Sequence, residues 1–126
     1  MTESEAMSFA RDWLAAWNSH DLERILEHYS EDVELTSPLV QRILGDGQHS
    51  VRGKDNLRAY FRRGLDTFPD LTFTLWGAYA GVHSVVVHYY SARGLGAAEL
   101  MAFDAEGHVS RVVAHYVVSI SSARPE

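Results

Sequence analysis

The second half of the sequence places the strongest limit on the fold, because it is predicted to consist of consecutive β-strands. After Pro69, apolar and polar residues alternate with the period of a half-buried strand. Short segments rich in glycine or acidic residues, such as 104–107, interrupt the alternation and are typical of hairpin turns. The predicted strands are 71–79, 82–92, 97–103 and 108–121. Strands joined by hairpins form an antiparallel sheet.

The sequence begins with a predicted amphipathic helix. Thr2 and Glu5 have the spacing of a capping box, in which each side chain satisfies a free backbone donor of the other residue. Apolar residues then recur every three or four positions up to Trp17, which is the period of a helix with one buried face. We expect this helix to end at Asn18 in a left-handed conformation.

The segment that follows is predicted to contain a short helix, a short strand, a loop and a third helix. Asp21 is expected to cap a brief second helix, and residues 33–37 alternate as a strand that Pro38 stops. A loop is expected over residues 39–53, and a third helix over residues 54–68. The loop is long and apolar, so we expect it to form the mobile lip of a pocket.

These elements predict one α+β domain over residues 1–126, a chain length that suits a single core. Three amphipathic helices can cover only one face of an antiparallel sheet. We therefore expect a cone-shaped roll, in which a curved antiparallel sheet wraps around three N-terminal helices and leaves an apolar cavity on its concave side.

Composition and charge exclude several classes of function. The net charge is −6, from 11 basic and 17 acidic residues, which disfavours nucleic-acid binding. The absence of cysteine excludes thiolate catalysis and disulfides, and the 7 histidines lack metal-binding spacing, so we expect no metal and no cofactor. An acidic N-terminus and the lack of a long apolar stretch favour a cytoplasmic protein that does not bind membranes.

Four short segments, in this order along the chain, resemble the nuclear-transport-factor-2-like superfamily, in particular its SnoaL-like polyketide cyclase and ketosteroid isomerase branches. The segments are residues 17–23 (WNSHDLE), 28–33 (HYSEDV), 51–55 (VRGKD) and 103–109 (FDAEGHV). The resemblance covers nearly the whole chain and implies a cone-shaped fold with an internal pocket. It leaves the activity open, because one scaffold hosts many functions.

The resemblance to ketosteroid isomerase also implies which positions face the pocket. The catalytic base of that enzyme falls on Ser37, its oxyanion tyrosine on Trp13 and its protonated carboxylic acid on Glu99. Serine is no base without a partner, and tryptophan donates only weakly. The resemblance therefore does not imply steroid isomerisation by the same mechanism.

Glu99 is the predicted catalytic residue. Counting back in twos from Phe103 places Met101 and Glu99 on one face of their strand, and the resemblance assigns that face to the concave side. A carboxyl group among apolar side chains has a raised pKa and suits acid–base work. The alternative is that Glu99 lies near the strand start and reaches solvent at the mouth of the cone.

The predicted ligand-binding residues are the aromatic and polar side chains expected to point inward. They are Trp13, Trp17, Tyr29, Ser37, Phe61, Tyr89, Met101 and Tyr116. Core aromatic residues with satisfied polar groups are the competing interpretation. The ligand is expected to be a hydrophobic small molecule.

Three functions follow from this reading. The first is a cofactor-independent cyclase or isomerase that transfers a proton on a hydrophobic carbonyl compound, with Glu99 as acid and base. The second is a module that binds an apolar ligand without converting it, and the third is a dimerisation scaffold. A second carboxylate in the pocket would favour the enzyme, and the sequence predicts none.

The convex face of the sheet is predicted to form a homodimer. The helices leave this face uncovered, and its predicted residues are more apolar than is usual on a monomer. They are Trp76, Val86, His88, Tyr90, Val113, His115 and Val117.

Overall fold

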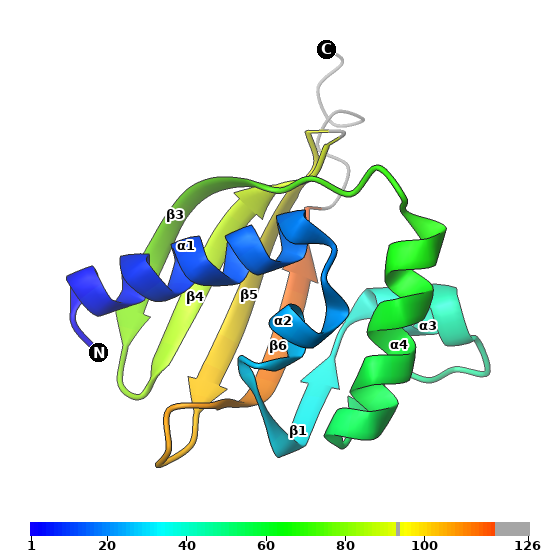
Figure 1. Cartoon of the computed structure of the whole chain (residues 1–126), viewed down its shortest axis with the longest axis horizontal. Coiled ribbons are helices and arrows are strands. Elements are labelled where there is room, and N and C mark those ends of the chain that lie inside the picture. Colours follow the sequence, from blue (N-terminus) through cyan, green and yellow to red (C-terminus); the bar gives the residue numbers. More distant parts are fainter. Residues whose placement is uncertain (93, 118–126) are drawn as a thin grey trace.

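The computed structural model describes residues 1–92 and 94–117 and shows four helices and six strands. In chain order these are α1 (Glu3–Ser19), α2 (Leu22–Leu26), β1 (Tyr29–Thr36), α3 (Pro38–Leu44), β2 (Ser50–Arg52), α4 (Lys54–Thr67), β3 (Thr74–Gly81), β4 (Ser84–Tyr90), β5 (Gly96–Phe103) and β6 (Val109–Tyr116). Helix α1 lies across the sheet and α4 stands beside β1 (Figure 1). The predicted α+β class is confirmed, whereas the predicted end of the last strand, 118–121, lies outside the described residues.

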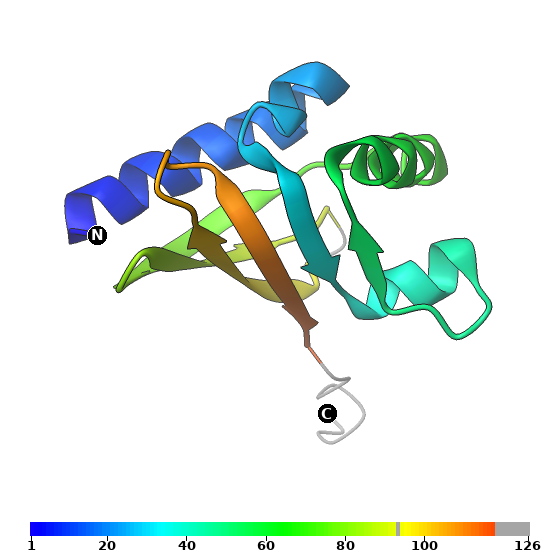
Figure 2. The ribbon, with the colours of Figure 1, turned by 90° about the horizontal axis from the view of Figure 1, so that it is seen from below.

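The strands form one curved, open sheet in the order β2-β1-β6-β5-β4-β3. The hairpin series from β3 to β6 is antiparallel throughout, as predicted. Strand β1 joins it parallel to β6, with Leu35 opposite Val112, and Figure 2 shows the two arrows running in one direction. Alternation within β1 predicts a strand but says nothing about its partner, so this parallel pairing was not predicted.

Helix α1 begins as predicted, and its left-handed C-terminal residue lies two positions later than predicted. Thr2 and Glu5 form the reciprocal capping box, with backbone-to-side-chain distances of 3.1 and 2.8 Å. The left-handed residue at the C-terminus is His20, with φ 60°, and not Asn18. The Asn18 side chain instead holds the chain that enters β3, since it accepts from Phe73 N at 2.7 Å and donates to Phe73 O at 3.0 Å. The end of α1 therefore positions the segment before β3.

The predicted loop 39–53 is wrong, because it contains helix α3 and strand β2. Pro38 ends β1, and it also occupies the first turn of α3, where its missing N–H costs no hydrogen bond. Ser37 caps this helix by accepting from Leu39 N at 3.1 Å. The apolar residues of the supposed loop are thus the inner face of a short helix, with Val40 fully buried.

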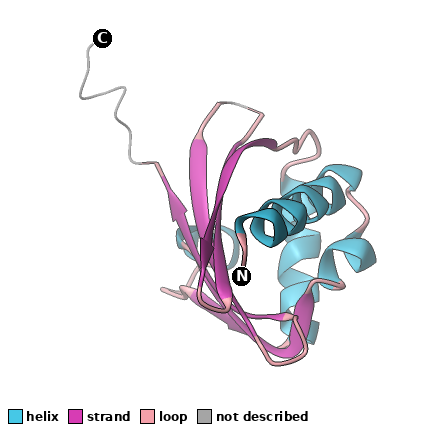
Figure 3. Ribbon diagram, turned by 90° about the vertical axis from the view of Figure 1, so that its left-hand side faces the viewer, coloured by secondary structure: helices cyan, strands magenta, loops and turns pink. Residues whose placement is uncertain are grey.

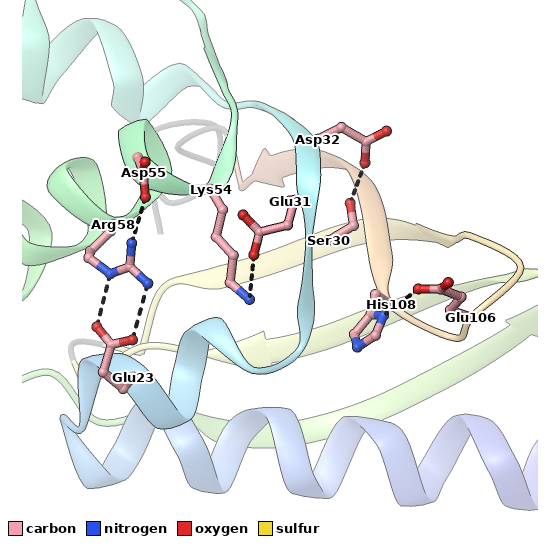
Figure 4. A network of polar contacts seen from close by, with 9 residues as sticks. All are labelled: Glu23, Ser30, Glu31, Asp32, Lys54, Asp55, Arg58, Glu106 and His108. Atoms are coloured by element: carbon pink, nitrogen blue, oxygen red, sulfur yellow. Dashed lines mark hydrogen bonds and ion pairs between the residues drawn. The ribbon is translucent and has the colours of Figure 1, made fainter.

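Helices α2 and α4 are joined by an arginine. Arg58 of α4 makes a two-pronged contact with Glu23 of α2, at 2.9 and 3.1 Å, and reaches Asp55 at 2.9 Å (Figure 4). The paired geometry of guanidinium and carboxylate fixes direction as well as distance. This contact links α4 to α2 at the surface, while the buried residues Leu57, Tyr60 and Phe61 pack α4 into the core. Helix α4 forms one wall of the cavity described below.

The hydrophobic core lies between the concave face of the sheet and the helices. On β4 the residues alternate, so that Val85, Val87 and Tyr89 are buried and their neighbours are partly exposed. Helix α1 lies against this inner face (Figure 3). None of the helices in residues 1–92 and 94–117 is long and apolar enough to cross a membrane.

Candidate functional site

A cavity of about 80 Å³ lies between the inner face of the sheet and helices α1, α3 and α4. It is several times larger than the space that one water needs, and smaller than pockets that enclose a drug-sized ligand. Aromatic side chains make up half of its lining. The lining residues are Trp17, Tyr29, Leu35, Ser37, Leu39, Ile43, Tyr60, Phe61, Gly64, Phe68, Leu71, Phe73, Tyr89, Glu99, Ala114 and Tyr116.

Glu99 is the only carboxylate among the described lining residues. It lies in the middle of β5, opposite Ala114 of β6, and is 7% exposed. Its Oε2 accepts a hydrogen bond from the Tyr89 hydroxyl at 2.5 Å. Its other oxygen has no hydrogen-bond donor among the described residues, so Oε1 is available to a molecule in the cavity. The structure thus places Glu99 inside and excludes the alternative that it reaches solvent.

Burial shifts the ionisation of Glu99 into the neutral range. Removal of the carboxyl group from water disfavours its charged form and raises its pKa from 4.5 to about 7, against the smaller opposing effect of the Tyr89 hydrogen bond. Near neutral pH, both protonation states are therefore populated. A group in this condition can accept a proton and return it.

Phenols surround this carboxyl group. Burial and the nearby Glu99 carboxylate raise the pKa of Tyr60 to about 12, and they raise the pKa values of Tyr29 and Tyr116 further. The Ser37 hydroxyl opposes this by lowering the pKa of Tyr60 and Tyr116. The tyrosines therefore stay neutral at physiological pH and act as hydrogen-bond donors beside one titrating carboxyl.

Two tryptophans of α1 approach the hydroxyl of Tyr29. Trp13 Nε1 donates to the Tyr29 oxygen at 2.9 Å, in a buried contact. Trp17 lies one turn further along α1 and contacts the Trp13 ring at 6.3 Å between centroids. The Trp17 Nε1 is buried and has no hydrogen-bond partner in the described residues.

Most of the predicted site residues gather around one cavity. Those that line it are Glu99, Trp17, Tyr29, Ser37, Phe61, Tyr89 and Tyr116. Trp13 and Met101 do not line it. Trp13 lies behind Tyr29, and Met101 shares the inward face of Glu99 but is fully enclosed in the core. An inward direction on a strand or helix does not distinguish the wall of a cavity from the packing behind it.

The predicted set of ligand-binding residues leaves out several lining residues at α4 and before β3. Tyr60, Gly64 and Phe68 continue the face of Phe61 at helical spacing, a signal that the sequence contains. Phe73 shares a face with Leu71 and Leu75 in the alternation of the predicted strand 71–79. In the structure it lies before β3, where the Asn18 side chain holds its backbone through two hydrogen bonds. The Phe73 ring packs 4.4 Å from Tyr89 and 6.0 Å from Trp13.

The described residues offer no cluster of three histidine, aspartate or glutamate side chains that could hold a metal ion. The polar groups carried by the lining residues are one carboxyl, several phenols, one serine hydroxyl and one indole N–H. Such a set can move a proton at one atom and hydrogen-bond an oxygen at another.

The SnoaL-like domain family matches residues 10–120 of the chain. A solved SnoaL-like protein of unknown function from Burkholderia thailandensis is 40% identical over 93% of this chain and 98% of its own, with a TM-score of 0.87. None of the curated proteins matches the chain in sequence.

Two more distant solved structures share the fold. A candidate isomerase of the SnoaL-like family from Agrobacterium tumefaciens is 21% identical over 91% of this chain and 99% of its own, with a TM-score of 0.70. A candidate ketosteroid isomerase from Kribbella flavida is 18% identical over 93% of this chain and 81% of its own, with a TM-score of 0.72. At these identities the likeness extends to the fold alone.

Proposed function

The chain belongs to the SnoaL-like domain family, and from that premise we propose that it is a cofactor-independent isomerase or cyclase acting on a hydrophobic carbonyl compound. The names of its structural neighbours support isomerase chemistry as a class. The finer assignment depends on one observation in this chain, which is the isolated, buried carboxyl of Glu99 with a pKa of about 7.

The proposed step is a proton transfer through Glu99. The free Oε1 takes a proton from the carbon next to the carbonyl group, and the C–H electron pair becomes the double bond of an enolate. The same carboxyl then returns the proton to a second carbon, so that atoms and electrons balance within the substrate. A base whose pKa lies near the working pH is suited to both halves of this transfer.

Binding without conversion is the second candidate, and the single carboxylate of the cavity favours it. Ser37, at the position that the resemblance assigns to the base of ketosteroid isomerase, lies buried and caps α3 through its side chain. It has no neighbouring histidine or lysine among the described lining residues that could activate it. If Glu99 does not transfer protons, the described lining residues offer no other candidate base.

Hydrogen–deuterium exchange on carbon tests the proposal without knowledge of the product. Small hydrophobic ketones are incubated with the protein in D₂O, and loss of the proton signal next to the carbonyl is followed by NMR. We expect the parent to catalyse exchange and Glu99→Gln to be slower by about a hundredfold or more. The matched control is Glu27→Gln, an exposed carboxylate after α2, which keeps the parent rate. Equal exchange in the parent and Glu99→Gln overturns the proposal.

A further inference from the structure

Trp17 carries a buried donor that the fold itself does not use. The residue is 8% exposed and lines the cavity, and its Nε1–H has no acceptor among the described residues. A buried donor without a partner is destabilising, and it is rare in native proteins. The described residues provide no acceptor for this donor, so a bound molecule is the candidate source of one.

Packing holds the Trp17 indole where it is. Its ring meets Phe61 of α4 edge-to-face at 4.7 Å, and it contacts Trp13 and Phe73 at 6.3 and 6.0 Å. Aromatic neighbours on three sides leave the ring little freedom to turn toward a distant acceptor. The donor is thus fixed in place before any ligand enters.

The candidate acceptor beside Trp17 is the Tyr29 oxygen, which already accepts a hydrogen bond from another residue. Trp17 lies close enough to lower the pKa of the Tyr29 phenol, but without the geometry of a hydrogen bond. The Tyr29 oxygen accepts instead from Trp13 Nε1 at 2.9 Å. Since that bond occupies a lone pair, the hydroxyl proton of Tyr29 remains to be donated, and no described residue accepts it. Two donors therefore lie near each other on residues that line the cavity.

We propose that Trp17 Nε1–H, with the Tyr29 hydroxyl beside it, binds an oxygen acceptor of the ligand, so that the cavity selects carbonyl compounds over hydrocarbons of the same shape. This inference rests on the proposed function and specifies the part of the site that recognises the substrate. Glu99 comes from β5, whereas the two donors come from α1 and β1. Charge that develops on the oxygen during proton transfer is stabilised by donors already in place.

The consequence is a specificity that depends on the acceptor atom. A site with a buried donor discriminates strongly against an analogue that lacks the matching acceptor, because the donor then stays unpaired. Removal of one neutral hydrogen bond to a buried donor changes affinity by about tenfold to a hundredfold.

The test compares cyclohexanone with methylenecyclohexane, which has a carbon in place of the carbonyl oxygen. Affinities of both probes are measured for the parent, for Trp17→Phe and for Trp13→Phe. We expect the parent to prefer the ketone by about tenfold or more and Trp17→Phe to lose that preference. Trp13→Phe is the matched control, since it removes an indole N–H that is already bonded to Tyr29. A preference that survives in Trp17→Phe overturns the inference.

A second measurement needs no variant. In protein labelled with ¹⁵N-tryptophan, the three indole N–H signals report on Trp13, Trp17 and Trp76 separately. Cyclohexanone is expected to shift the Trp17 signal downfield, methylenecyclohexane is not, and the exposed Trp76 serves as the internal reference. If cyclohexanone does not shift the Trp17 signal, the inference is wrong.

The two proposals fail in different ways. A ketone that shifts the Trp17 signal but undergoes no deuterium exchange supports the recognition site and contradicts the proposed enzyme. Exchange that depends on Glu99 but is unaffected by Trp17→Phe supports the enzyme and overturns the recognition site.

Discussion

Tyr89 and Glu99 are diagonal neighbours on adjacent antiparallel strands, and the phenol of one donates to the carboxylate of the other over 2.5 Å. In the register of β4 and β5, Tyr89 pairs with Ala97 and Glu99 pairs with Val87, so both side chains point to the concave face. Such diagonal pairs are within reach of aromatic side chains. The strand register therefore creates the contact that orients the only cavity carboxyl of the described chain.

Tyr89→Phe is expected to raise the pKa of Glu99 above its value of about 7. The hydrogen bond stabilises the ionised carboxylate, whereas burial opposes ionisation and remains in the variant. Titration of ¹³C-labelled glutamate by NMR measures the midpoint directly. Tyr79→Phe, at a half-exposed phenol on the other face, leaves the midpoint unchanged. A midpoint that stays the same or falls in Tyr89→Phe contradicts the assigned role of the hydrogen bond.

Glu99 is expected to make the folded chain less stable as the pH rises. Its pKa is about 7 in the folded state against an ordinary value of 4.5, so the folded state binds more protons between these values. The stabilisation is fully present below pH 4.5 and is lost as the pH rises through 7. A shift of this size corresponds to about 3 kcal/mol of unfolding free energy.

Denaturant unfolding of the parent and Glu99→Gln at pH 5 and pH 8 checks this linkage. The difference between the two proteins isolates Glu99 from other titrating groups. At pH 8 we expect Glu99→Gln to be at least as stable as the parent, since it carries no buried charge. If its unfolding free energy at pH 8 is instead clearly lower than that of the parent, Glu99 is structural.

Local sequence signals predicted most of the inner face of the sheet. Alternation in residues 82–92 and 97–103 fixes which side chains share a face with Tyr89 and with Glu99, because the side-chain period of a strand is two residues. For Glu99, the resemblance to ketosteroid isomerase was needed to assign that face to the concave side. The hairpin order fixed the neighbours β3 to β6 as well. These features depend on residues close together in the chain.

The missed features depend on contacts between distant residues. The parallel pairing of β1 with β6, and the position of Phe73 under Asn18, are set by packing across the fold. Helix α3 was missed for another reason, since Pro38 both stops a strand and begins a helix, and only the strand signal was considered. The unpaired donor of Trp17 is likewise invisible in sequence, because a missing partner is a property of the packed site.

A homodimer through the convex face stays a prediction of this fold. Trp76 is 60% exposed and its ring packs at a tilt against His88, with 4.6 Å between centroids. Tyr79 and Leu100 are also exposed on this side. Burial of this face against a second copy would remove the apolar surface from water. Light scattering is expected to give twice the monomer mass of 14.1 kDa at micromolar concentration.

Introduction of a charge at Trp76, on the edge strand β3 of this face, tests the interface. Trp76→Glu is expected to give the monomer mass, because dimer formation would bury an unpaired carboxylate. Val82→Glu is the matched control, since Val82 is 85% exposed in the turn between β3 and β4 and lies off the face. A parent protein that is monomeric, or a Trp76→Glu variant that remains dimeric, contradicts this interface.

The turn after α3 is expected to be the most mobile part of the cavity rim. Leu39 and Ile43 of α3 line the cavity, so entry of a ligand larger than the present space requires α3 to move. The three residues that follow α3, Gly45, Asp46 and Gly47, all have positive φ and few backbone hydrogen bonds. In amide hydrogen exchange, residues 45–49 should exchange much faster than β5, and saturation with a bound ketone should slow them. Protection of 45–49 equal to that of β5 would show that the rim is rigid and that only molecules matching the existing cavity can enter.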